Sequence, residues 1–245
     1  MSISGAAGSG EAIRPLPAPV ATPLPSLYNG GMPDITLAQI AGFLLAAALI
    51  TLAPGPDNLS VLSLGLSRGR RAGIGFGLGC ALGCFTHTIW ATIGVTALIA
   101  ASDTAFAALK FAGAAYLVWL GVQALKSPGA KFTAEAEGTP PQEAMRPYVM
   151  RGFVANAINP KVALFFLAFL PQFVDPARGA AAAQTALLGT LFALQTVLIF
   201  GALGWYAGTV GGWLRGRPAV GRWLDRATGV LFIGLGIRLA LAQRG

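Results

Sequence analysis

Two short motifs place a charged residue directly behind a proline in largely apolar sequence. The first is PGPDN, residues 54–58, and the second is NAINPK, residues 156–161. Proline removes a backbone donor, so each motif predicts a break in a helix. A charge in apolar surroundings is costly unless it has a partner or a function. The motifs therefore predict one site at which the acid Asp57 and the base Lys161 occupy related positions.

Each charge also has a plainer interpretation. Asp57 precedes a helix expected over residues 58–68, and aspartate is a favoured N-cap residue. Lys161 could be a structural residue at a helix start whose charge is satisfied locally. Capping and binding are compatible, because the same helix N-terminus carries free N–H groups and a partial positive charge.

One helical face carries the chain's single histidine and its two cysteines. Cys80, Cys84 and His87 lie at i, i+4 and i+7, which puts them on the same side of a helix. That spacing could hold a soft metal, but fewer than four ligands are visible, so a packed or pore-lining face is favoured and no metal or cofactor is expected. Phosphate-binding loops and hydrolase motifs are absent, which predicts that the chain is not an enzyme.

The elements that carry these motifs are expected to be membrane-spanning helices. Of the 245 residues, 55% are hydrophobic and 11% charged, with a mean hydropathy of +0.66. Several charge-free runs reach the roughly 20 residues that a helix needs to cross a bilayer. We predict an all-α polytopic membrane protein with about six transmembrane helices, over residues 35–54, 73–101, 104–125, 152–174, 181–212 and 224–242.

Basic residues fall mainly in alternate connections between these spans. Eleven of the seventeen lysines and arginines lie after the first, third and fifth spans, and cytoplasmic loops collect positive charge. The net charge of +8 is thus explained by topology, and no nucleic-acid partner is expected. The pattern predicts that both termini lie outside the cytoplasm.

The domain organisation follows from composition. Residues 1–34 are rich in proline and are expected to be a disordered tail without a signal peptide. Residues 127–150 mix Pro, Gly and Glu and are expected to be a cytoplasmic linker. They separate two three-helix halves, 35–126 and 151–245. An odd number of spans in each half predicts inverted repeats, an architecture common among secondary transporters.

Two series of glycines recur at every fourth residue, at positions 75, 79 and 83 and at 204, 208 and 212. Small residues at this spacing let helices approach closely in a membrane. We expect both series to be helix contacts. They would also suit a non-transporting membrane scaffold or assembly protein, or a homo-oligomer.

The motifs together resemble the LysE/RhtB family of bacterial amino-acid exporters. The resemblance covers about residues 35–242 and is carried by APGPDNLSVLSLGLSRGRRAGIGFGLGCALG, LKFAGAAYLVWLGVQAL and RGFVANAINPKVALFFLAFLPQFVD, in that order. It implies a multi-pass exporter in the bacterial cytoplasmic membrane for amino acids or derivatives of the homoserine, threonine or lysine type. An ion gradient or the membrane potential would drive export. Its motif positions are the helix breaks Pro54, Gly55, Pro56 and Pro160 and the binding residues Asp57, Asn58, Asn156, Asn159 and Lys161.

The working hypothesis is that an amino acid binds between the two breaks in the lipid bilayer. Lys161 and a helix N-terminus would attract the substrate carboxylate, and Asp57 its ammonium group. Substrate would then separate an Asp57–Lys161 pair, and Asp57 could also carry a proton. His87 is a further candidate proton relay. The alternative within transport is a heavy-metal or inorganic-cation exporter that uses the cysteines and His87.

Overall fold

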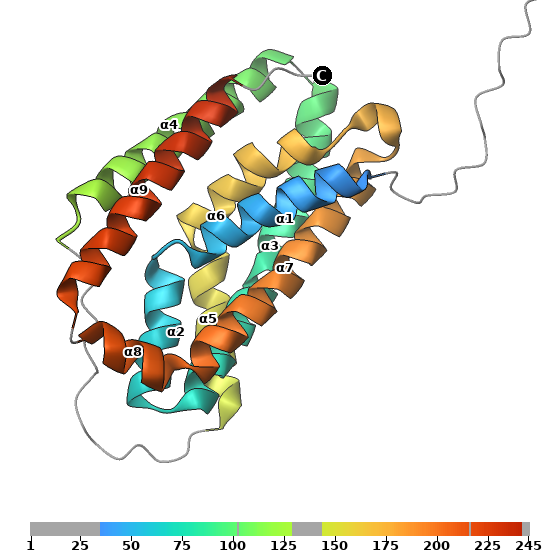
Figure 1. Ribbon diagram of the computed structural model, residues 1–245. Coiled ribbons are helices and arrows are strands. Elements are labelled where there is room, and N and C mark those ends of the chain that lie inside the picture. The colour runs from blue at the N-terminus through green and yellow to red at the C-terminus, as the bar shows by residue number, and fades with distance from the viewer. Residues whose placement is uncertain (1–34, 102, 129–143, 216, 242–245) are drawn as a thin grey trace, which may run out of the picture. The chain divides into compact units, whose positions relative to one another are not determined.

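The computed structural model describes residues 35–101, 103–128, 144–215 and 217–241, and within these ranges the ordered elements are helices, with no strand (Figure 1). The predicted all-α class is confirmed. The tail predicted over residues 1–34 and most of the linker predicted over 127–150 lie outside the described residues.

The first membrane element is a broken pair of helices. α1 (Leu37–Leu52) begins at a capping box in which Thr36 and Gln39 bond each other's backbone N–H groups. It stops before Pro54, and α2 (Pro56–Ser67) continues at 58° to it. The span predicted over residues 35–54 thus corresponds to α1 to within a few residues. The sixteen residues of α1 measure about 24 Å, shorter than the roughly 30 Å of a bilayer core, and α1 and α2 are long and apolar enough for a span only when taken together.

The next two helices agree with the sequence to within a few residues. Gly69, at φ 86°, makes the turn that leads into α3 (Arg70–Ala101). α4 (Asp103–Lys126) follows and extends one residue beyond each end of the predicted range 104–125. Both are unbroken because the apolar sequence over them contains no proline.

A second broken element opens the other half. α5 (Met145–Ala157) begins inside the range predicted as linker. α6 (Pro160–Leu164) then continues through a π-helical segment, Phe165–Phe169, and a 3₁₀ segment, Leu170–Phe173. The two parts of this element meet at 49°. Both predicted helix breaks are thus confirmed.

The last helices correct one predicted span. α7 (Ala181–Trp205) ends at Tyr206, and α8 (Ala207–Arg215) is a separate short helix that packs on α2. The span 181–212 is therefore wrong beyond Trp205, because α8 turns to contact α2 at its Ala207. α9 (Pro218–Leu241) closes the chain.

Within the described residues, three helices are long and apolar enough to cross a membrane, and counting each bent pair as one span gives up to five. The three are Arg70–Gly94, Ala107–Lys126 and Ala181–Trp205. α9 has 24 residues, long enough for a sixth span at about 36 Å, but it carries four charged residues. A polytopic membrane protein is confirmed, and the sixth span stays a prediction.

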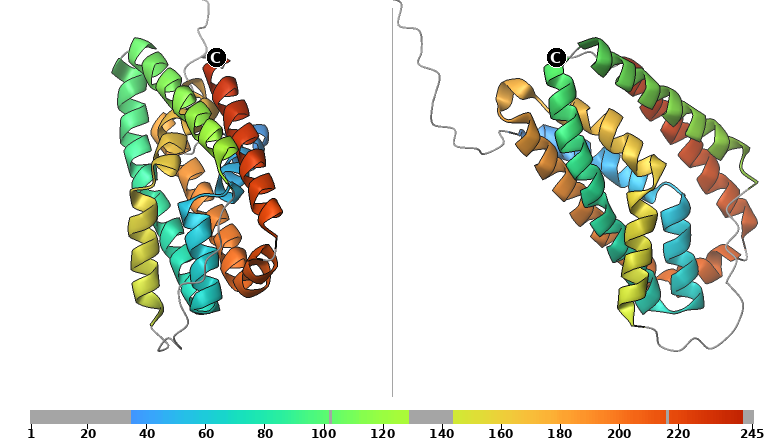
Figure 2. Two further views of the ribbon diagram at one scale, coloured as in Figure 1. Left: turned by 90° about the vertical axis from the view of Figure 1, so that its left-hand side faces the viewer. Right: turned by 180° about the vertical axis from the view of Figure 1, so that it is seen from behind.

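Packing joins helices from the two predicted halves. α3 lies along α5 and α7, and α4 lies beside α9 (Figure 2). The main core is aromatic and collects Phe43, Phe165, Phe166 and Phe192. This pairing of α3 with α7 and of α4 with α9 is what a two-fold relation between the halves would produce.

The prediction that both glycine series make helix contacts is confirmed for the first series and is wrong for most of the second. A Cβ at position 75, 79 or 83 would meet α5, so these glycines let α3 and α5 touch. Gly204 likewise faces α3 at Gly73 and Ile74. Gly208 and Gly212 face open space, because the helix ends at Trp205 and their register is lost.

Candidate functional site

The break between α1 and α2 and the break between α5 and α6 lie near the middle of the long helices (Figure 1), and residues from both breaks line one cavity. Its free volume is about 10 Å³, which is about the space of one water molecule. Of the predicted site residues, Asp57, Asn156 and Lys161 line it. The rest of its wall is Ile50, Thr51, Val162, Phe192, Thr196 and Phe200.

Asp57 is buried at the start of α2, with 3% of its surface exposed. Its Oδ2 accepts a hydrogen bond of 2.8 Å from Nδ2 of Asn156, across from the other half. The N-cap of α2 is Gly55, with no side-chain cap, so the interpretation of Asp57 as an N-cap is wrong. Its carboxylate lies in the first turn, where the helix dipole stabilises a negative charge.

Lys161 occupies the equivalent position in α6, directly after Pro160. Its Nζ donates to the backbone oxygens of Ile50, at 3.1 Å, and Ala53, at 3.0 Å. The helical partner of the Ile50 oxygen would be the N–H of residue 54, which is a proline and has none. The break in α1 therefore supplies the acceptor that holds the ammonium group of the other half.

The predicted Asp57–Lys161 pair is not formed. Both side chains line the cavity, but within the described residues no ion pair joins them. Asp57 bonds Asn156, and Lys161 bonds the end of α1. Since an ammonium group has three N–H donors and two are used, one remains for the cavity.

The other two predicted asparagines stand beside the cavity rather than in its wall. Nδ2 of Asn58 donates to the backbone oxygen of Thr51 at 2.7 Å. Oδ1 of Asn159 accepts from the backbone N–H of Lys161 at 3.0 Å, which makes Asn159 the N-cap of α6. Three buried polar atoms near the breaks have no partner in the described structure: Oγ1 of Thr51, Oδ1 of Asn58 and Nδ2 of Asn159.

His87 and Cys84 contact Asn156. Nε2 of His87 lies 2.8 Å from the backbone oxygen of Asn156, and because a carbonyl only accepts, Nε2 carries the proton. Sγ of Cys84 lies 3.6 Å from Oδ1 of Asn156 and 3.3 Å from the backbone oxygen of Cys80. Among the described residues, no three His, Cys, Asp or Glu side chains are placed to hold a metal ion.

Sequence reasoning missed two buried threonines that line the cavity, Thr51 and Thr196. Thr196 on α7 is 1% exposed, and its hydroxyl donates to the backbone oxygen of Phe192. Thr51 is buried in the last turn of α1. A polar residue inside an apolar span is the signal that could have found both.

Buried opposite charges at two helix breaks in a polytopic helical protein define the class of membrane transport proteins. The model of LysE type translocators matches residues 48–243, and this chain belongs to that family. The resemblance noted from the motifs is thus confirmed.

Named relatives agree with this placement. A homoserine/homoserine lactone efflux protein of Salmonella typhimurium is 29% identical over 82% of this chain and 95% of its own length. A leucine efflux protein of Enterobacter sp. is 30% identical over 81% and 93%. An uncharacterized membrane protein of Vibrio cholerae is 33% identical over 82% and 96%. No solved structure matches the chain.

Proposed function

We propose that this chain exports amino acids across the bacterial cytoplasmic membrane and binds them in the cavity between the two helix breaks. The observation that carries the proposal is that Asp57 and Lys161, one from each break, line the same cavity without bonding each other. An acid and a base held apart match the ammonium and carboxylate groups of an amino acid. Two relatives are named as efflux proteins for such solutes.

In the proposed complex, the substrate carboxylate accepts the remaining N–H of Lys161, and the ammonium group donates to Asp57. Oγ1 of Thr51, which has no partner in the described structure, is a further donor on the same wall. Phe192 and Phe200 provide the apolar part of the wall. Polar groups thus fix the shared part of every amino acid, and the phenyl rings face its side chain.

Binding requires the cavity to widen, because about 10 Å³ is far less than an amino acid occupies. The bends of 58° and 49° at the breaks are places where half-helices can move against α3 and α7. Opening toward one side of the membrane and then the other would be alternating access. Asp57 would bind and release a proton during this cycle, which couples export to an ion gradient.

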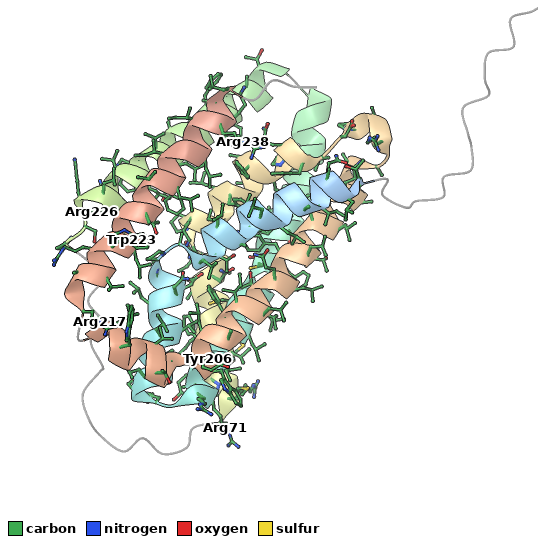
Figure 3. All side chains as sticks on the ribbon, viewed as in Figure 1. Arg71, Tyr206, Arg217, Trp223, Arg226 and Arg238 are labelled. Atoms are coloured by element: carbon green, nitrogen blue, oxygen red, sulfur yellow. The ribbon has the colours of Figure 1, made fainter. Side chains whose placement is uncertain are left out.

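The end of the molecule that carries α8 is proposed to face the cytoplasm. Arg71 and Arg217 lie at this end, and Arg238 lies toward the other (Figure 3). Two arginines here stack on tryptophans, Arg70 over Trp205 at 4.8 Å and Arg217 over Trp213 at 4.5 Å. Basic and aromatic residues together are typical of a cytoplasmic membrane interface.

This orientation is tested with two exposed alanines, Ala219 near α8 and Ala180 before α7. A membrane-impermeant maleimide added to whole cells should label Ala180→Cys and leave Ala219→Cys unlabelled until the membrane is opened. The native Cys80 and Cys84 are buried and give a low background. The reverse labelling pattern would show that the orientation is inverted.

Counterflow of labelled leucine and homoserine into proteoliposomes tests the function. Wild-type protein should exchange at least one of them, and Asp57→Asn and Lys161→Met should lose about tenfold or more, as expected when a charged partner of the ligand is removed. Lys110→Met is the matched control, since Lys110 is on α4 and contacts the Phe111 ring. Full exchange by both site variants would refute the site.

A further inference from the structure

The end of α1 forms an oxygen-lined site for a positive charge. Pro54 and Pro56 lack N–H groups, so the backbone oxygens of Ile50 and Leu52 have no helical donor four residues on. The oxygens of Ile50 and Ala53 converge on one point, the Nζ atom of Lys161. They also lie at the negative end of the α1 dipole, which favours a cation.

Further oxygen atoms line the cavity that Lys161 enters. Thr51 and Asp57 line the same cavity as Lys161, and Oγ1 of Thr51 is buried with no partner in the described structure. Backbone oxygens at the C-terminal end of a half-helix coordinate sodium ions in transporters, and hydroxyl and carboxylate oxygens are further hard donors. The oxygen donors of this cavity therefore match the chemistry of a monovalent-cation site.

The ammonium group of Lys161 already fills this place. The side chain is 8% exposed and comes from the second break, on the other half of the chain. A Cβ at Gly55 would lie 2.9 Å from Nζ, so glycine at this position leaves the space that the ammonium group needs. The dipole of α6 opposes a positive charge at its own N-terminus, which makes the end of α1 the better place for it.

We propose that the first helix break is a monovalent-cation site that Lys161 occupies as a tethered cation in place of a sodium ion. The intact chain then needs no Na⁺ to join its two halves, and removing the lysine side chain opens the site to Na⁺ from solution. This inference concerns an inorganic cation and does not rest on the proposed substrate.

Thermal unfolding of the purified full chain in detergent tests it, with NaCl compared with choline chloride at equal ionic strength. Lys161→Ala leaves the site open, and Na⁺ should raise its Tm by about 2–4 °C, as expected for a ligand bound only by the folded state. Wild-type protein should show the same Tm in both salts. Lys161→Met is the matched control, because its side chain fills the space without leaving room for an ion.

Radioactive ²²Na⁺ binding to the same proteins provides a second readout that does not depend on transport. Lys161→Ala should bind Na⁺, and adding Thr51→Val should weaken that binding about tenfold, the loss of one ligand. Wild-type protein and Lys161→Met should bind none above background. Sodium binding by wild-type protein would overturn the proposal.

The remaining outcomes are also decisive. Lys161→Ser, whose hydroxyl can join the ligands, should respond to Na⁺ as the alanine variant does. Failure of both variants to fold in NaCl, or folding without any response to Na⁺, would overturn the tethered-cation proposal. If wild-type protein showed no amino-acid counterflow, the proposed function would be refuted, and the result on the cation site would not be affected.

Discussion

The two helix breaks have the same order of residues but stabilise opposite charges in different ways. Pro56 and Pro160 each stand first in a new helix, and Asp57 and Lys161 each stand second. The dipole at a helix N-terminus favours the acid and opposes the base. The dipole of α2 thus adds to the stabilisation that Asp57 receives from Asn156, whereas Lys161 must find negative charge away from its own helix.

Lys161 finds partial negative charge at the C-terminal end of α1, in the other half of the chain. Its two bonds to backbone oxygens there cross the same interface as the bond from Asn156 to Asp57. The ammonium group of the second break is thus stabilised by backbone oxygens of the first break. The carboxylate of the first break, in turn, accepts a hydrogen bond from the amide of Asn156 in the second half. Any movement that separates the halves must replace these bonds, and the groups of an amino acid could do so.

The breaks also begin their second helices differently. α2 follows Gly55, which has no side chain to cap with, and α6 follows Asn159, whose Oδ1 accepts the N–H of Lys161. A side chain at position 55 would collide with Lys161. The N-cap position of α2 is therefore a glycine without a capping side chain, and the space is filled by Lys161 from the second break. This unequal arrangement can be tested one residue at a time.

The largest effect on stability is expected from Asn156→Ala. Asn156 is 1% exposed and is the hydrogen-bond donor to Asp57. Its loss leaves a buried carboxylate without that partner and should cost about 1.5–3 kcal/mol, the range for a hydrogen bond to a charged group. The free energy of unfolding in detergent measures this. Asp57→Asn combined with Asn156→Ala should recover part of the loss, and a fully additive cost would contradict the coupling.

A smaller effect is expected from Asn159→Ala. This change removes the N-cap of α6 and should lower the free energy of unfolding by about 1 kcal/mol. Asn159→Asp keeps a capping oxygen and should remain close to wild type in the same unfolding experiment. If Asn159→Ala cost more than Asn156→Ala, the cap of the second break would matter more than the contact between the breaks.

Much of the fold could be predicted because charge-free length and proline act locally. The sequence predicts a helix over 104–125, and α4 runs over Asp103–Lys126. Both proline motifs break a helix where they stand. The end of α7 at Tyr206 could not be predicted, since the apolar run continues through it. That end reflects the packing of α8 on α2, a contact between segments far apart in the sequence.

The candidate site was predictable in composition but not in its bonds. The motifs identified Asp57, Asn156 and Lys161, which line the cavity. The direct pairing of Asp57 with Lys161 was wrong, because each charge has a closer partner in the opposite half. The partners of Lys161 are the backbone oxygens of Ile50, whose helical donor is missing at Pro54, and of Ala53, and the positions of both depend on the bend between α1 and α2.

The most direct test of the central claim compares homoserine with homoserine lactone as competitors of counterflow. The lactone keeps the ammonium group and has no carboxylate. If Lys161 binds the carboxylate and Asp57 the ammonium group, Lys161→Met should weaken competition by homoserine about tenfold and spare the lactone, while Asp57→Asn should weaken both. Equal losses for both solutes in Lys161→Met would contradict the account.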